Sequence, residues 1–449
     1  MKFIETLKNV WKITELKDRI VLTLGLLLVY RFGAQVVLPG IDASQLGNLQ
    51  AGAGDGILGI LNMFTGGAFA NASVFALGIM PYISASIVVQ LMGIAIPYLQ
   101  KLQKEGASGQ KKITQITRWL TIIICLFQAP GYLASLQPAF GIPASAFLLG
   151  TGPTFYISSV IILVTGCIFA MWLGEKITDK GIGNGISLLI MVGIIATLPL
   201  SFIQNAASRL DGGGNGGLMM ILIELVIWFV IIMASVMLVM AVRKIAVQYA
   251  RRTASGGYEK NVFGSRQFLP LKLNASGVMP IIFAQAIMFV PSLIGKSLGS
   301  SEAGQWIQAQ FTDIFGFWYN VVFALLIIIF TYFYTAITVP TNKMADDLKR
   351  SGGFIPGIRP GTETSEYLDK IMSQITLPGS IFLALIAVFP AFIVKLMDVQ
   401  AGWALFFGGT SLLIMVGVAI DTMQQVNSYL LNKHYDGLMK TGKNRKAVA

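Results

Sequence analysis

The chain has little charge, only two cysteines and a single histidine. Asp, Glu, Lys and Arg make up 12% of its 449 residues, whereas soluble domains contain about a quarter. Hydrophobic residues make up 55%, and the mean hydropathy is +0.70. A soluble fold of this size could not bury that much apolar surface, so the composition predicts a membrane protein.

The scarcity of cysteine and histidine excludes several kinds of site. Cys125 and Cys167 both lie in apolar runs, which is typical of buried free thiols and not of a disulfide framework or a zinc site. The one histidine, His434, lies in the polar C-terminal tail. We therefore expect no metal, no cofactor, no Ser/His/Asp or Cys/His triad, and no enzymatic activity.

Long apolar runs dominate the rest of the chain. A run of about 20 residues crosses a hydrocarbon core of about 30 Å. The sequence has ten such runs: Ile20–Val37, Ala76–Pro97, Trp119–Leu136, Phe155–Leu173, Gly183–Leu200, Leu218–Val242, Val278–Ile294, Trp318–Val339, Ile375–Val394 and Gly402–Val426. The stretch 1–19 before them is charged and amphipathic. The apolar run after it is too long for the hydrophobic part of a signal peptide and has no small-residue cleavage site, so we expect no cleavage here. The prediction is an all-α polytopic protein with ten spans.

The placement of Lys and Arg predicts the topology. Of the 33 basic residues, 29 lie in the two termini and in the connections that share their side of the membrane. The other four are Arg31, Arg209, Lys296 and Lys395. By the positive-inside rule both termini are cytoplasmic, as an even number of spans requires. The net charge of +12 would then face the cytosol, where it can meet an acidic partner or anionic lipid.

Two long basic connections stand out on the cytoplasmic side. They are residues 243–272 and 341–371, and the second contains the Gly/Pro-rich run Gly353–Gly361. Charge alone leaves two alternatives, a solvated loop that only sets topology and a docking surface. Glycine and proline at close spacing favour a loop of fixed shape.

The residues before the second apolar run, Gly56–Ala72, are apolar but too few to cross the membrane. The pair Gly66-Gly67 interrupts them. Either they form a re-entrant half-helix beside a water-filled cavity or they form an interfacial amphipathic helix.

Five spans followed by five would place two halves, residues 20–200 and 201–427, in inverted orientation, ahead of a cytoplasmic tail at 428–449. That inference rests on the count of spans, because no residue-level repeat is visible.

Ionisable residues inside the apolar runs are few. Arg31 lies near the outer end of the first run, where its side chain can snorkel to the surface, and Glu224 and Asp421 lie near interfaces. This scarcity favours a path that is not built on charge. Isoleucines are candidates for lining such a path, although isoleucine is ordinary in membrane helices. Ile79 and Ile83 share one helix face in the second run, and three others lie near the midplane of three other runs: Ile190, Ile282 and Ile414.

Five motifs are specific enough to indicate a family. They are LNMFTGGAFANASVFALGIMPYISAS at Leu61–Ser86, GIGNGIS at Gly181–Ser187, LPLKLNASGVMP at Leu269–Pro280, KRSGGFIPGIRPG at Lys349–Gly361 and FGGTSLLI at Phe407–Ile414. Together they resemble the SecY family, the channel subunits of the Sec translocon, over nearly the whole chain and in the right order.

The resemblance implies ten spans in two inverted five-helix halves around a central hourglass pore. The pore would pass unfolded secretory polypeptides and release transmembrane segments sideways into lipid. The five isoleucines named above would form the apolar ring at the waist of the pore. Residues 57–72 would be the plug that closes the outer funnel at rest, with these residues carried over: Gly59, Asn62, Phe64, Gly66, Gly67 and Ala72.

The resemblance also implies a gate and partners. The second and seventh spans would form a lateral gate with polar residues Ser84, Gln90, Gln128 and Asn274. The basic loops would dock the SecA motor ATPase and the ribosome through these residues: Arg251, Arg252, Lys260, Arg266, Lys349, Arg350 and Arg359. Loop 243–272 departs from the common bacterial pattern, so which of its basic residues make contact stays open. Further implied partners are the small subunits SecE and SecG, signal-bearing nascent chains and lipid, in a bacterial inner membrane.

Two other functions remain as alternatives. A secondary transporter of a small solute predicts a charged or polar substrate site at mid-membrane, which the apolar runs do not offer. A membrane-embedded enzyme predicts a catalytic constellation, and the sequence contains none.

Overall fold

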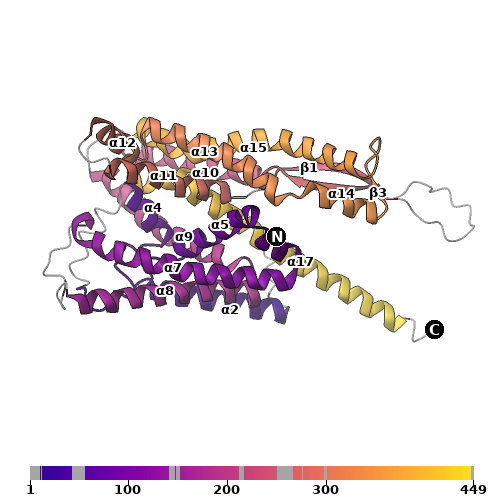
Figure 1. Ribbon diagram of the computed structural model, residues 1–449, viewed down its shortest axis with the longest axis horizontal. Coiled ribbons are helices and arrows are strands. Elements are labelled where there is room, and N and C mark those ends of the chain that lie inside the picture. Colours follow the sequence, from indigo (N-terminus) through magenta and orange to yellow (C-terminus); the bar gives the residue numbers. More distant parts are fainter. Residues whose placement is uncertain are drawn as a thin grey trace, which may run out of the picture. The chain divides into compact units, whose positions relative to one another are not determined.

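The computed structural model describes residues 11, 13–42, 56–140, 147, 152–211, 217–249, 266–275, 277–297 and 301–445. Helices make up most of this part of the chain (Figure 1). The helices are α2 Thr14–Gly33, α4 Gly56–Phe64, α5 Met80–Ala95, α6 Pro97–Lys104, α7 Ala107–Phe140, α8 Pro153–Lys180, α9 Gly185–Asp211, α10 Gly217–Met240, α11 Met279–Ser297, α12 Glu302–Thr312, α13 Phe317–Thr338, α14 Thr341–Arg350, α15 Thr362–Met397, α16 Ala401–Ala404, the 3-10 helix η3 Leu405–Phe407, and α17 Gly409–Arg445.

Each of the ten apolar runs overlaps at least one helix, but fewer helices meet the requirements for a span. In the described residues six helices are long and apolar enough to cross a membrane, or up to eight if each of two bent pairs is one span. Helix α2 is in neither group. Four charged residues near its start, Glu15, Lys17, Asp18 and Arg19, shorten its apolar part. The protein is therefore a multi-pass helical membrane protein, and the number ten stays a prediction.

One bent pair consists of α5 and α6, whose axes differ by 102°. The bend falls at Ile96, which has φ −101° and ψ 114°, immediately before Pro97. A proline ring disfavours the helical conformation of the preceding residue, so the second apolar run ends here.

The chain divides into two compact units. The first contains Met1–Asp211, Ala401–Trp403 and Val418–Ala449, and the second contains Gly212–Gln400 and Ala404–Gly417. Helix α17 therefore begins in the second unit and ends in the first. In the first unit α8 packs against α2, α7 and α9 (Figure 1). The predicted boundaries at 200/201 and 427/428 stay predictions.

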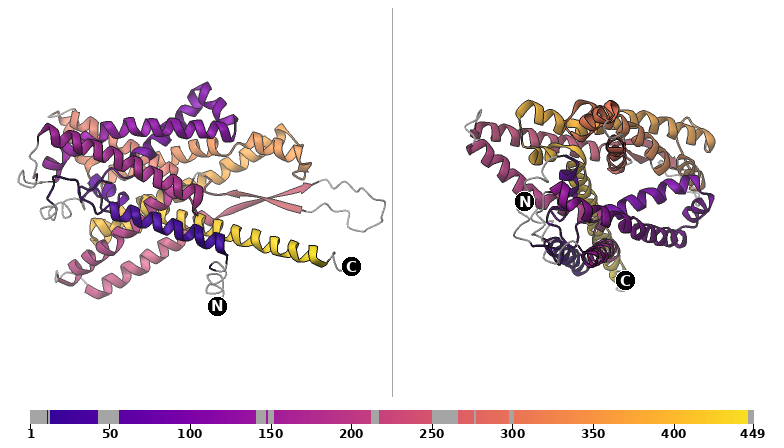
Figure 2. Two further views of the ribbon diagram at one scale, coloured as in Figure 1. Left: turned by 90° about the horizontal axis from the view of Figure 1, so that it is seen from below. Right: turned by 60° about the vertical axis from the view of Figure 1, so that its left-hand side comes forward.

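In the second unit a small sheet stands where the sequence predicted only basic loops. Its strands are β1 Val242–Tyr249, β2 Arg266–Lys272 and β3 Gly353–Phe354, in the order β2-β1-β3 with antiparallel pairing. The two long strands are the arrows in Figure 2. The sheet was missed because basic residues flank the apolar ones in β1. Buried residues of the two long strands pack on the first turns of α15, which fixes the sheet to that helix: Ile245, Val247 and Leu271 against Leu368, Ile371 and Ile375.

Candidate functional site: the plug segment and the ring isoleucines

The predicted plug segment, residues 57–72, contains a short helix and a tight turn. Helix α4 ends at Phe64, and Gly66 and Gly67 follow with φ +66° and +89°. These left-handed conformations favour glycine. The Gly67 N–H donates to the Asn62 carbonyl oxygen at 2.9 Å, and the Ala70 N–H donates to Asn62 Oδ1 at 3.0 Å. Asn62 therefore folds the segment back onto itself from both its backbone and its side chain.

The end of the plug segment belongs to the core of the first unit. Phe69, Ala70 and Ala72 are buried in a cluster that includes Tyr132 of α7. The Tyr132 hydroxyl donates to the Phe69 carbonyl oxygen at 2.8 Å, and the two rings lie 4.8 Å apart. The Leu38 N–H donates to the Ala72 carbonyl oxygen at 2.9 Å. Residues 69–72 are therefore anchored in this core, although the resemblance includes them in the plug.

The turn of the plug segment touches the backbone of α9. A Cβ added to Gly193 would lie 2.9 Å from the Phe64 carbonyl oxygen and 3.3 Å from the Gly66 nitrogen. Arg31 of α2 reaches the same turn, because its Nη1 donates to the Gly66 carbonyl oxygen at 2.8 Å. The turn is thus held from α9 by close packing and from α2 by a charged donor.

The plug turn also lies between the two segments that carry the first unit's ring isoleucines. These isoleucines are all buried: Ile79, Ile83 and Ile190. A Cβ on Gly78, the neighbour of Ile79, would lie 3.0 Å from Thr65 Cγ2 in the turn. On the other side, Gly193 contacts the turn and lies one helical turn after Ile190. The plug segment therefore contacts both segments that carry these isoleucines.

The other two ring candidates lie in the second unit, on α11 and α17. The Thr410 hydroxyl donates to Gln285 Oε1 at 3.2 Å, and a Cβ on Gly417 would lie 3.6 Å from Val278. These two contacts show that the helices run antiparallel. Ile282 and Ile414 lie between the contacts and so at about the same level. A ring of all five isoleucines would draw on both units and stays a prediction.

The four predicted gate residues differ in their surroundings. Ser84 and Gln90 are partly buried and hydrogen-bond within α5, to the Met80 carbonyl oxygen at 3.1 Å and to Ser86 Oγ at 3.4 Å. Gln128 is exposed on α7, and Asn274 lies in the turn after β2. Their role in a gate stays a prediction.

The predicted docking residues are only partly within the described chain. Arg359 is 88% exposed, and its guanidinium lies 3.8 Å from Glu363. Thr364 fixes the Arg359 backbone by donating to its carbonyl oxygen at 2.8 Å. Lys349 and Arg350 are exposed in the last turn of α14, where they complement the helix dipole. Arg266 begins β2, and three residues lie outside the described residues: Arg251, Arg252 and Lys260.

Sequence reasoning used Gly181–Ser187 only as a family motif and missed its structural role. The Ile182 N–H donates to Thr23 Oγ1 of α2 at 3.1 Å, and the Gly183 N–H donates to Gln425 Oε1 of α17 at 2.9 Å. A Cβ on Gly185 would clash with the Gly174 carbonyl oxygen. The glycines therefore let the α8–α9 turn fit between α2 and α17, and only their clustering hinted at this.

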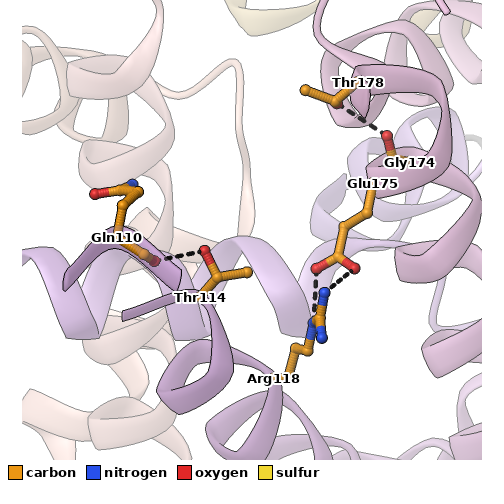
Figure 3. Close-up of polar contacts among 6 residues, drawn as sticks. All are labelled: Gln110, Thr114, Arg118, Gly174, Glu175 and Thr178. Atoms are coloured by element: carbon orange, nitrogen blue, oxygen red, sulfur yellow. Dashed lines mark hydrogen bonds and ion pairs between the residues drawn. The ribbon is translucent and has the colours of Figure 1, made fainter. Parts of the chain in front are cut away.

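A second missed feature is an ion pair that joins α7 to α8. Arg118 Nε donates to Glu175 Oε1 at 2.9 Å and Arg118 Nη2 to Glu175 Oε2 at 2.6 Å (Figure 3). Beside it the Thr178 hydroxyl donates to the Gly174 carbonyl oxygen at 2.9 Å. A bidentate guanidinium–carboxylate contact fixes both the distance and the orientation of two helices.

Neither metal chemistry nor a reactive thiol has support in the described part of the chain. There, no group of three His, Cys, Asp or Glu residues could hold a metal ion. Cys125 and Cys167 are free and buried.

Comparison with known proteins places the chain close to one family. Residues 73–423 match the SecY family. The chain is 37% identical to the protein translocase subunit SecY of Chlamydia trachomatis, covering 97% of this chain and 98% of the relative. It is 39% identical to the subunit of the same name from Escherichia coli, covering 95% and 94%.

Solved structures show a similar fold. One is a SecY protein whose plug domain stabilises the closed state of the translocation channel and maintains a membrane seal, with TM-score 0.61, 18% identity and 91% of each chain covered. A second is a protein-conducting channel, with TM-score 0.58, 17% identity and the same coverage. A third is the channel of the canine ribosome–channel complex from the endoplasmic reticulum, with TM-score 0.56, 17% identity and the same coverage. At these identities the likeness concerns the fold.

Proposed function

This chain belongs to the SecY family, and from that premise we propose that it forms a channel for unfolded secretory polypeptides and releases transmembrane segments sideways into lipid. The observation that carries the proposal is the seating of the plug segment. Its turn contacts the two segments that bear Ile79 and Ile190, through Gly78 and Gly193. A related channel has a plug domain that stabilises its closed state.

The proposed ring works through its lack of polar groups. Isoleucine side chains offer no hydrogen bonds to a passing chain, so they do not discriminate between sequences. They are bulky enough to close around an extended polypeptide and to exclude water from the constriction, which limits ion leak. No step of this mechanism is covalent, and the protein is not an enzyme. ATP hydrolysis by the SecA motor, or synthesis by the ribosome, drives the movement.

The remaining parts of the proposal follow the family. Spans two and seven form the lateral gate, in which weak interhelical hydrogen bonds yield to an apolar signal helix. The sheet and the exposed Arg359 form the cytoplasmic docking surface for the motor and the ribosome. The protein spans the bacterial inner membrane ten times with both termini in the cytoplasm, together with SecE and SecG.

Site-specific crosslinking tests the proposal. Cys125 and Cys167 are first replaced by alanine, and Ile83→Cys is combined with a secretory substrate that carries one cysteine and is stalled during transit. We expect a disulfide between channel and substrate. Phe127→Cys is the control, because Phe127 is 79% exposed on α7 and should face lipid. Equal crosslinking at both positions, or none at Ile83→Cys in the engaged complex, contradicts the proposal.

A further inference from the structure

Arg31 is the single charged residue in the apolar run Ile20–Val37. A cation within a span is costly unless it finds water or a polar partner. From the sequence we expected the side chain to snorkel to the outer surface. In the structure it is partly buried, and its Nη1 donates to the backbone carbonyl oxygen of Gly66 at 2.8 Å. The charge of α2 is therefore directed at the plug segment.

The acceptor residue is suited to this contact. Gly66 has φ +66°, and a Cβ there would lie 2.5 Å from Arg31 Nη1 and 2.8 Å from Gly193 Cα. Any other residue would therefore be strained and would push away either the guanidinium or α9. Glycine allows Arg31 and Gly193 to hold the turn from two directions.

We propose that Arg31 is a positioning residue that keeps the plug segment in its closed seat. This rests on the proposed function, which supplies the meaning of closed and open. The hydrogen bond is charge-assisted and exists only while Gly66 occupies its seat. It therefore stabilises the closed state alone and lowers the ratio of open to closed channels. Because the acceptor is a backbone oxygen, this effect does not depend on the side chains of the plug segment.

Removal of the bond should shift that ratio toward the open state. Leucine at position 31 keeps the apolar contacts of a span but has no donor. We expect the open-to-closed ratio to rise at least about tenfold, which is the lower end for one hydrogen bond to a charged group. A signal helix would then need less differential affinity to complete the opening, so substrates with weaker signals should also be exported.

The test measures the position of the plug segment directly. The full-length protein, with Cys125 and Cys167 replaced by alanine, carries a reporter cysteine in place of Leu61 and is reconstituted in lipid vesicles. The rate of modification by a membrane-impermeant maleimide is measured without substrate. Arg31→Leu should raise the rate at least about tenfold. Arg31→Lys should raise the rate less, because the lysine side chain is shorter but keeps the positive charge and N–H donors.

Two controls separate positioning from general loosening. Lys395→Leu removes an exposed cation at the end of α15 and should leave the rate unchanged. A second reporter, Leu133→Cys in the core of the first unit, should stay unreactive in the Arg31→Leu protein. A Leu61→Cys rate that does not change in Arg31→Leu overturns the proposal. So does a joint rise at both reporters, which would mean that the unit has merely loosened.

The same preparation distinguishes this inference from the proposed function. If the reporter rate depends on Arg31 but no secretory chain crosses the membrane, the positioning role stands and the channel function fails. If chains cross and Arg31→Leu leaves the reporter rate unchanged, the channel function stands and the positioning role fails.

Discussion

Gly193 of α9 and Phe64 at the end of α4 meet backbone to backbone, because a Cβ on Gly193 would lie only 2.9 Å from the Phe64 carbonyl oxygen. Packing this close leaves no room for a side chain. The plug segment therefore rests on α9 through a glycine, and the contact should be sensitive to a single methyl group.

Gly193→Ala should displace the plug segment without unfolding the protein. Alanine favours the helical conformation of α9 by up to about 1 kcal/mol, whereas its Cβ conflicts with Phe64 and Gly66. We expect an unchanged or slightly raised melting temperature together with increased ion leak through idle channels in planar bilayers. Gly131→Ala is the matched control, because α7 leaves nothing within 4 Å of a Cβ at that position. Equal leak in the two variants would show that Gly193 does not seat the plug segment.

The Arg118–Glu175 pair should contribute modestly to the packing of α7 on α8. The two side chains are 49% and 17% exposed, so screening limits the bond despite its bidentate geometry. A double-mutant cycle of Arg118→Gln and Glu175→Gln should give a coupling free energy of about 0.5–1 kcal/mol, measured by denaturant unfolding in detergent. The coupling should shrink at high salt. A value near zero at low salt would mean that the contact only accompanies the packing of the helices.

Arg359→Glu tests the docking surface. The side chain is exposed, and its ion pair with Glu363 is long, at 3.8 Å. Exposed ion pairs contribute little to stability, so the reversal should leave the fold intact. We expect SecA-driven export and ribosome binding to fall at least tenfold while the ion leak of idle channels stays the same. Ribosome binding by the unmodified protein should weaken with salt, because the ribosomal surface presents phosphates.

Lys395→Glu is the matched control for that reversal. Lys395 is also exposed, and the topology predicted from the sequence puts it on the opposite side of the membrane. It should leave docking unchanged. Normal motor-driven export by Arg359→Glu would remove this arginine from the docking surface.

Much of the helical architecture could be predicted from the sequence. Ten apolar runs all coincide with helices, because the hydrocarbon core admits only segments that satisfy their own backbone hydrogen bonds. The sheet at Val242–Tyr249 could not be predicted in the same way. Its strands depend on pairing with distant residues such as Gly353 and Phe354 and on burial against α15.

The candidate site shows the same division. The sequence motifs predicted which residues form the plug segment, and the pair Gly66-Gly67 follows closely after the end of its helix at Phe64. They did not reveal that Phe69–Ala72 lie in the core. Deletion of the whole predicted plug, residues 57–72, would therefore remove core packing as well as the plug. A replacement that ends before Phe69 would keep the three buried residues of Phe69–Ala72 in place.

Local composition thus predicted residence in the membrane, because this depends on how each segment partitions between water and lipid, and five sequence motifs predicted the family. The seating of the plug segment depends instead on atoms far apart in the chain. Arg31 and Gly66, or Phe64 and Gly193, meet only after several helices have packed. Such contacts arise from the folded geometry and leave no periodic pattern in the sequence.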